Sequence, residues 1–249
     1  MTNPLKWGIL STGGIADQFT RDVLRLPDHR VVAVGSRKLS RANDFADRFA
    51  IKNRHGNYQD LFNDPEVDAI YVATHHPLHA RDTIDALNAG KPVLCEKPFA
   101  MSQAETQAMV DAAKKNNLLL MEAMWARYLP HMIRIREIIK SGVLGEIISV
   151  RADHGQWFNL DPEFRLFKAE LGGGALFDLG IYPISFASMV LGTPERVTAR
   201  STKAFTGVDG QTSIILEYKS GAQAILNATN LAATPNRALI VGRDARIEI

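Results

Sequence analysis

The strongest constraint on the fold of this chain is the alternation of two hydrophobic periods across its first half. Short apolar runs typical of buried strands occur at 7–10, 31–34, 69–73, 93–95 and 118–121. Segments with apolar residues at helical spacing lie between them, at 15–25, 41–49, 77–89 and 102–115. Strands that alternate with helices of roughly 10 to 15 residues are typical of a parallel sheet with helices on both faces. Residues 1–124 are therefore predicted to form a doubly wound α/β domain.

The second half of the chain changes character after a predicted helix at 130–141. Strand-like runs follow at 147–152, 196–201, 212–218, 222–227 and 238–241, and one further helix is expected at 176–191. Strands joined by short turns without intervening helices indicate a largely antiparallel sheet. Residues 125–249 are predicted to form an α+β domain whose last residues, 246–249, enter another strand.

Composition points to small-molecule ligands. The chain has 249 residues and a formal net charge of +2 with both signs well mixed, so no basic face is expected for nucleic acid. Cys95 is the single cysteine, which excludes a disulfide framework and favours a reducing compartment. No apolar run approaches the roughly 18 residues of a membrane-spanning helix, and no secretory signal is evident. We expect a cytoplasmic protein without a nucleic-acid or membrane partner.

A glycine-containing turn follows the first predicted strand. Its sequence, Ser11-Thr12-Gly13-Gly14-Ile15-Ala16, fits the dinucleotide pattern G-x-G-x-x-G/A, except that Ser11 replaces the first glycine. Gly13 would let the main chain approach a pyrophosphate, and the first amides of the next helix would face its phosphates. Small residues in such turns also occur in α/β proteins that bind no nucleotide. The position on the first strand favours a nucleotide site, with candidate contacts at Ser11, Thr12, Gly13, Gly14 and Ile15.

The end of the second strand bears on the choice of cofactor. NAD sites usually place Asp or Glu there for the ribose 2′-hydroxyl, but no acid occurs before Asp44. Ser36 and Arg37 could instead bind a 2′-phosphate, the arginine through its planar, charged fork. NADP is therefore favoured over NAD. The alternative is that Arg37 and Lys38 are solvated residues at a strand end.

Two further motifs suggest chemistry. Glu96, Lys97 and Pro98 leave the strand at 93–95, at the edge where open parallel sheets bind ligands, and Pro98 restricts Lys97 to extended conformations. Glu96 could pair with a cation or contact the cofactor, whereas a surface turn is the other interpretation. Later, three glycines at 172–174 lead into a helix and would leave its first amides without partners. Asp178 and Tyr182, four residues apart, would share one face of that helix, although they could equally be an N-terminal helix charge and a core aromatic.

Together these motifs resemble the glucose-fructose oxidoreductase / inositol dehydrogenase (Gfo/Idh/MocA) family. The shared pattern is Glu96-Lys97-Pro98 followed by Gly-Gly-Gly-Ala-Leu-x-Asp178-x-Gly-x-Tyr182. Met121-Glu-Ala-Met-Trp125-x-Arg127 and Thr74-His-His-Pro-Leu-His79 are most similar to its dihydrodiol and NADP-dependent D-xylose dehydrogenases. The resemblance implies a Rossmann domain, then an α+β domain with a large, open, mostly antiparallel sheet, and a homodimer formed through that sheet. Because such relatives continue past the strand at 246–249, the chain resembles a carboxyl-terminally shortened member.

The resemblance also implies roles for individual residues. Lys97 and Tyr182 would form the catalytic pair, with Asp178 contacting substrate or cofactor. Further cofactor contacts would be Thr74, His75, His76, Leu78, His79, Glu96, Lys97 and Arg165, the last of them near the substrate. The implied reaction moves a hydride between NADP and the CH–OH carbon of a sugar or trans-dihydrodiol. A lysine cation close to the phenol would favour its ionised form.

Alternatives to this interpretation stay open. Many relatives have histidine where this chain has Tyr182, so the proton carrier departs from the pattern of those relatives. The chain could also be a nucleotide-responsive regulatory protein without catalysis, or a sugar oxidoreductase that keeps its cofactor bound. A zinc site at His75, His76 and His79 is disfavoured because the spacing is loose and the chemistry requires no metal.

Overall fold

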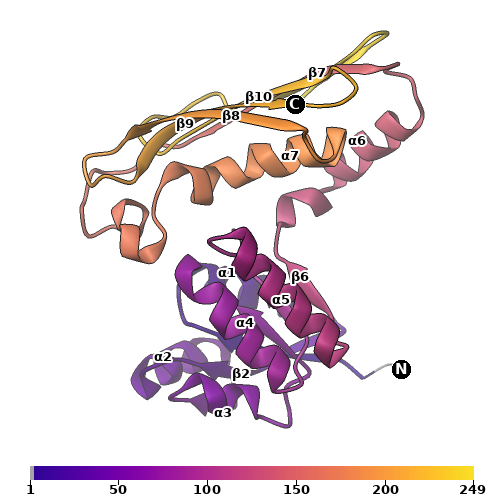
Figure 1. Cartoon of the computed structure of the whole chain (residues 1–249). Coiled ribbons are helices and arrows are strands. Elements are labelled where there is room, and N and C mark those ends of the chain that lie inside the picture. Colours follow the sequence, from indigo (N-terminus) through magenta and orange to yellow (C-terminus); the bar gives the residue numbers. More distant parts are fainter. Residues whose placement is uncertain (1–2) are drawn as a thin grey trace. The chain divides into compact units, whose positions relative to one another are not determined.

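The computed structural model describes residues 3–249 and separates the chain into two compact units, the first ending at Ala123 and the second beginning at Met124. Both units are continuous in sequence (Figure 1). One contains a parallel sheet and the other a mostly antiparallel sheet, which confirms the predicted fold class.

The sheet of the first unit is entirely parallel, with the strand order β3-β2-β1-β4-β5-β6. Its strands are β1 (Leu5–Leu10), β2 (His29–Gly35), β3 (Asn53–His55), β4 (Ala69–Val72), β5 (Val93–Cys95) and β6 (Leu120–Glu122). The order reverses between β1 and β4, so the carboxyl ends of these two strands mark the switch point where such sheets bind ligands. The short edge strand β3 was not predicted from the sequence.

Helices cover both faces of this sheet. They are α1 (Gly14–Val23), α2 (Leu39–Phe49), α3 (Tyr58–Phe62), α4 (His79–Asn88) and α5 (Gln103–Asn116), and a 3-10 turn, η1 (His76–Leu78), precedes α4. Neighbouring residues of β1 show the two faces: Ile9 packs in one core cluster with Phe45 of α2, and Leu10 packs in another with Leu87 of α4. This division explains why the central strands read as continuous apolar runs.

The sheet of the second unit has the strand order β12-β11-β7-β10-β9-β8. Its strands are β7 (Ile147–Gly155), β8 (Arg196–Lys203), β9 (Asp209–Glu217), β10 (Gln223–Thr229), β11 (Ala238–Gly242) and β12 (Arg246–Glu248). All pairings are antiparallel except that of β7 with β10. As Figure 1 shows, α6 (Pro130–Lys140) and α7 (Ile181–Leu191) cover one face, where Phe186 packs against the sheet. The other face exposes Ile148, Ile215 and Ile225, so the sheet is open.

Residues 169–191 depart from two expectations. The helix predicted at 176–191 begins as a π-helix, η5 (Leu176–Gly180), before α7. By length and composition alone, residues 169–191 are also long and apolar enough to span a membrane, so the expectation that no segment is of that kind was wrong. Phe186 and Ala187 of this segment lie in the core beneath the sheet. Core helices of globular proteins pass the same test, and this packing is that of a core helix.

Candidate functional site

The turn between β1 and α1 has the geometry of a phosphate-binding turn. Ser11, which stands at the first glycine of the pattern, has φ 94°, in the region that favours glycine. At Gly14 an added Cβ would find no described atom within 4 Å, and at Gly13 it would meet only Ser11 Oγ at 4.0 Å. None of the side chains that the structure describes caps α1, and Ala16 is fully buried against the sheet. Open space and uncapped amides fit the phosphates of a dinucleotide.

The end of β2 adjoins the same turn, because the Ser11 amide donates to the carbonyl oxygen of Gly35 at 2.9 Å. Ser36 is 7% exposed, and its amide donates to the carbonyl of His55 at 3.0 Å. Arg37 is exposed at the start of the connection to α2. Burial raises the pKa of Tyr58 at the start of α3, and the nearby guanidinium groups of Arg37 and Arg81 oppose that rise. The positive charge that a 2′-phosphate needs is therefore present beside β2.

His79 joins two loops at the carboxyl edge of the parallel sheet. Its ring is fully buried, with Nδ1 2.8 Å from the carbonyl oxygen of Pro98 and Nε2 3.0 Å from that of Thr74. Burial lowers the pKa of His79, and the two carbonyls oppose this. Both ring nitrogens lie within hydrogen-bond distance of main-chain carbonyl oxygens, so His79 ties the two loops together. The interpretation of His79 as a cofactor contact stays a prediction.

The other predicted contacts of this loop surround His79. His76 is buried in η1, with its ring edge-on to that of His79, while His75 is exposed and Leu78 is half-buried. Within residues 3–249, the structure brings together no group of three or more His, Cys, Asp or Glu side chains that could hold a metal ion.

The segment that carries Lys97 is held by two carboxylates, that of buried Glu96 and that of half-buried Glu122. Glu96 is 6% exposed and accepts a hydrogen bond from the Tyr71 hydroxyl. It also accepts a hydrogen bond from the main-chain amide of Lys97, at 3.1 Å. Burial raises the pKa of Glu96, and these hydrogen bonds oppose it. The Lys97–Pro98 bond is cis, and the next amide, that of Phe99, donates to Glu122 Oε1 at 3.0 Å. Glu96 thus fixes the main chain of Lys97 from inside the domain.

The three glycines at 172–174 have a structural reason that the sequence did not reveal. A Cβ at Gly173 would lie 2.6 Å from the carbonyl oxygen of Leu166, and one at Gly174 (φ +119°) would lie 2.0 Å from Asp209 Oδ1. Asp209 Oδ2 accepts the amide of Leu176 at 2.7 Å. The expectation that the first helical amides are left bare is therefore wrong for the Leu176 amide, which Asp209 binds at the start of the helix. At Gly173 and Gly174 the absence of a side chain allows close packing instead.

Asp178 and Tyr182 each have partners within the second unit. Asp178, which is buried in the π-helix, accepts a hydrogen bond from Arg165 Nη2 at 2.9 Å. The hydroxyl of Tyr182, in the first turn of α7, accepts the indole N–H of Trp125 at 3.1 Å. The ring of His154, on β7, lies 4.9 Å from the Tyr182 ring. π-helical turns are frequent at functional sites, and this one contains Asp178 and leads directly into α7, which carries Tyr182.

Tyr182 also lines a pocket of about 160 Å³ between the helices and the sheet of this unit. Its other polar lining residues are Arg127, Asp153, His154, Ser185, Asn236 and Arg237, and its apolar lining includes three methionines, Met124, Met132 and Met189. Sequence reasoning had assigned no role to His154 or Asp209. Neither belongs to a motif, because each is brought to the site by pairing of distant strands.

Comparison with known proteins places the chain in a family. The model described as "Oxidoreductase family, NAD-binding Rossmann fold" matches residues 5–124, and the model described as "GFO/IDH/MocA C-terminal domain" matches residues 132–248. The chain belongs to the Gfo/Idh/MocA oxidoreductase family. The resemblance seen in the sequence motifs is confirmed.

Curated relatives in this family are dehydrogenases. Trans-1,2-dihydrobenzene-1,2-diol dehydrogenase of Xenopus laevis is 44% identical over 248 residues, which cover 98% of this chain and 74% of the relative. The Danio rerio protein of the same name is 41% identical over 249 residues, with the same two coverages of 98% and 74%. This Gfo/Idh/MocA member is accordingly an NAD(P)-dependent dehydrogenase by class.

Solved structures agree with the fold of this family member. An aldose-aldose oxidoreductase from Caulobacter crescentus, complexed with glycerol, has a TM-score of 0.91 at 30% identity and covers 99% of this chain and 77% of its own. A 3-ketoreductase from Actinomadura kijaniata, in complex with NADP and TDP-benzene, has a TM-score of 0.90 at 30% identity, with coverages of 99% and 76%.

Proposed function

We propose that this chain is an NADP-dependent dehydrogenase that oxidises a CH–OH group of a trans-dihydrodiol or a sugar. The observation that carries the proposal is the Tyr182 hydroxyl, which accepts a hydrogen bond from the Trp125 indole at the start of α7. Support comes from the diol dehydrogenases at 44% and 41% identity, and from the sugar-related enzymes among the solved structures.

The residues of the first unit fit the cofactor. The amides of residues 13–15 would receive its pyrophosphate, and Ser36 and Arg37 would receive the 2′-phosphate that distinguishes NADP from NAD. When bound, the nicotinamide supplies the carbon that exchanges a hydride with the substrate carbon. Within the family, NADP occurs in the 3-ketoreductase structure and NADH in that of a levoglucosan dehydrogenase, so the family alone does not select one of them.

We assign proton movement to Tyr182, and charge stabilisation to Trp125 and, as the family resemblance implies, to Lys97. The Tyr182 oxygen would take the substrate hydroxyl proton as the hydride leaves. Trp125 already donates to this oxygen at 3.1 Å, so it would stabilise the ionised form of the oxygen that receives the proton. The Lys97 ammonium would donate to the substrate oxygen, with its main chain fixed by Glu96. Arg165 would hold Asp178 beside the substrate.

Tyr182→Phe tests the proposal. The rate of NADP reduction with trans-1,2-dihydrobenzene-1,2-diol, D-xylose or D-glucose should fall about 100-fold or more, as expected for loss of a general base. The dissociation constant for NADP should stay within about twofold. Tyr128→Phe is the matched control, because Tyr128 lies in the same unit and is 59% exposed. Wild-type turnover in Tyr182→Phe would remove Tyr182 from the mechanism.

A second candidate is a sugar oxidoreductase that keeps its cofactor bound, which the similarity to the aldose-aldose oxidoreductase favours. In that case the purified protein would release stoichiometric NADP on denaturation and convert one sugar at the expense of another without added cofactor. A protein that binds NADP but turns over neither diols nor sugars would instead be a regulatory member of the family.

Two further proposals concern assembly and location. A homodimer would form through the open face of the second sheet, where Ile215 and Ile225 are exposed. Ile225→Lys should then shift the sedimentation coefficient towards that of a monomer, and an unchanged coefficient would reject this interface. A cytoplasmic location, proposed from the single buried cysteine, is tested by cell fractionation.

A further inference from the structure

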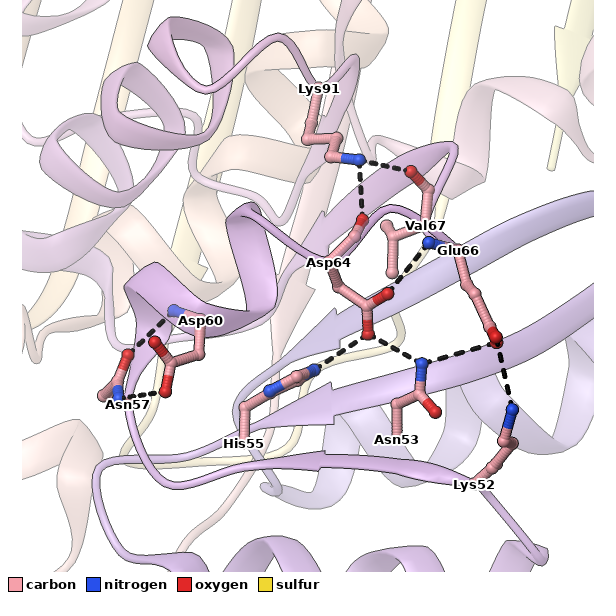
Figure 2. A network of polar contacts seen from close by, with 9 residues as sticks. All are labelled: Lys52, Asn53, His55, Asn57, Asp60, Asp64, Glu66, Val67 and Lys91. Atoms are coloured by element: carbon pink, nitrogen blue, oxygen red, sulfur yellow. Dashed lines mark hydrogen bonds and ion pairs between the residues drawn. The ribbon is translucent and has the colours of Figure 1, made fainter.

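A buried carboxylate organises the outer edge of the first sheet, as Figure 2 shows. Asp64 lies between α3 and β4 and is 5% exposed. Its Oδ2 accepts the side-chain amide of Asn53 at 2.8 Å and lies 2.9 Å from Nε2 of His55. Its Oδ1 accepts the amide of Glu66 at 2.9 Å. One carboxylate thus binds both ends of the three-residue strand β3.

Asp64 is itself a fixed point. The ammonium group of Lys91, just before β5, donates to the carbonyl oxygens of Asp64 at 2.8 Å and Val67 at 2.6 Å (Figure 2). Burial alone would raise the pKa of Asp64, but the hydrogen bonds from His55, Glu66 and Asn53 outweigh it and lower the pKa. The group is therefore an ionised acceptor that holds two donors from β3.

The strand that Asp64 holds is the support for the end of β2. Within the described residues, β3 pairs only with β2, in the register Gly35↔His55. The carbonyl of His55 then accepts a hydrogen bond from the Ser36 amide at 3.0 Å. This is the last main-chain hydrogen bond before Arg37. His55 is therefore clamped from two sides: its ring by Asp64 and its carbonyl by Ser36.

We propose that His55 and Asp64 are positioning residues for cofactor selectivity, which hold residues 36–37 where they can bind the 2′-phosphate of NADP. The inference rests on the NADP-dependent function proposed above. Charge-assisted, bidentate contacts from arginine depend on geometry, so a shift of about 1 Å in the supporting strand weakens them strongly. NAD has no 2′-phosphate, and its pyrophosphate would bind at the β1–α1 turn. Loosening β3 should therefore weaken NADP binding and spare NAD binding.

The test compares the dissociation constants of NADP and NAD by isothermal titration calorimetry on the full chain. His55→Ala and Asp64→Ala should each weaken NADP binding about tenfold, which is the effect of losing one hydrogen bond between residues 36–37 and the charged 2′-phosphate. Each should change NAD binding less than about twofold. His55→Gln keeps a side-chain amide that can donate to Asp64, so it should restore most of the NADP affinity. Asn57→Ala is the matched control: its side chain caps α3 by accepting the Asp60 amide at 2.8 Å, but it has no bond to β3 among those shown in Figure 2.

The outcomes separate this inference from the proposed function. If wild-type protein prefers NADP and His55→Ala keeps the wild-type ratio of the two constants, His55 has no positioning role and the inference is overturned. An equal loss for both cofactors, as in a general structural defect, overturns it as well. If wild-type protein binds NAD as tightly as NADP, the proposed cofactor itself is wrong. Should Asp64→Ala fail to fold, the His55→Ala and His55→Gln pair decides the question alone.

Discussion

The contact between Gly174 and Asp209 predicts a coupled effect of two substitutions. In Gly174→Ala, the new methyl group would lie 2.0 Å from Asp209 Oδ1, and φ +119° would be strained for alanine. The backbone strain costs about 1–2 kcal/mol. Displacing the carboxylate loses its hydrogen bond to the Leu176 amide, which adds about 2 kcal/mol. The single substitution should therefore destabilise the protein by about 3–4 kcal/mol.

Asp209→Ala alone removes the acceptor of the Leu176 amide at 2.7 Å and of the Thr212 hydroxyl at 3.2 Å. We expect a loss of about 2 kcal/mol, moderated because burial raises the pKa of Asp209 and so disfavours its charged form. In the double variant the carboxylate is lost only once, and Gly174→Ala then costs only its backbone strain. The two effects should fall short of additivity by about 2 kcal/mol.

Urea unfolding of the four proteins, followed by circular dichroism, measures this coupling. Gly142→Ala is the control, because Gly142 has φ +76° and no described atom lies within 4 Å of an added Cβ. It should cost about 1–2 kcal/mol in both backgrounds. If Gly174→Ala costs the same with and without Asp209, the assignment of Gly174 to close packing against Asp209 is refuted.

Three further predictions concern the first unit. Ser11→Gly should raise the melting temperature, because relief of φ 94° is worth about 1 kcal/mol, and a lower melting temperature would contradict it. Burial raises the pKa of Cys95 to about 12, so a thiol reagent should modify it only as the protein unfolds; rapid labelling of the native state would be the opposite result. The pKa of Asp64 is lower in the folded than in the unfolded state, so its stabilising contribution should disappear as pH falls below the ordinary value of 3.8. Acid titrations of stability should therefore be less steep for Asp64→Asn than for wild type, and identical slopes would count against this.

The sequence pattern predicted the central strands of the first unit and missed its edge. Asn53, Arg54 and His55 form no apolar run, and α3 is only five residues long, so neither has a periodic signal. What places β3 is a carboxylate from the following loop, which is a tertiary contact. The parallel pairing of β7 with β10 was missed for a related reason, since nothing local to either strand records it.

The candidate site shows the same limit. The β1–α1 turn could be predicted because the strand, the glycines and the helix follow one another directly in the sequence. Ser11, at the position of the first glycine, has a positive φ, which is typical of glycine. The glycines at 172–174 were singled out, but the reason for Gly174 lies in Asp209, on a strand that comes later in the chain. Trp125 and His154 reach Tyr182 from separate elements, so only coordinates could group them.

The order of pairing in the second sheet has a consequence for synthesis on the ribosome. The first sheet is complete once β6 has emerged, so that half can fold while translation continues. β7, by contrast, lies between β10 and β11, which are translated much later. Until residues 223–242 are available, the nascent chain carries Ile147, Val150 and Ala152 without their neighbours. This interval is when aggregation or chaperone binding should be greatest.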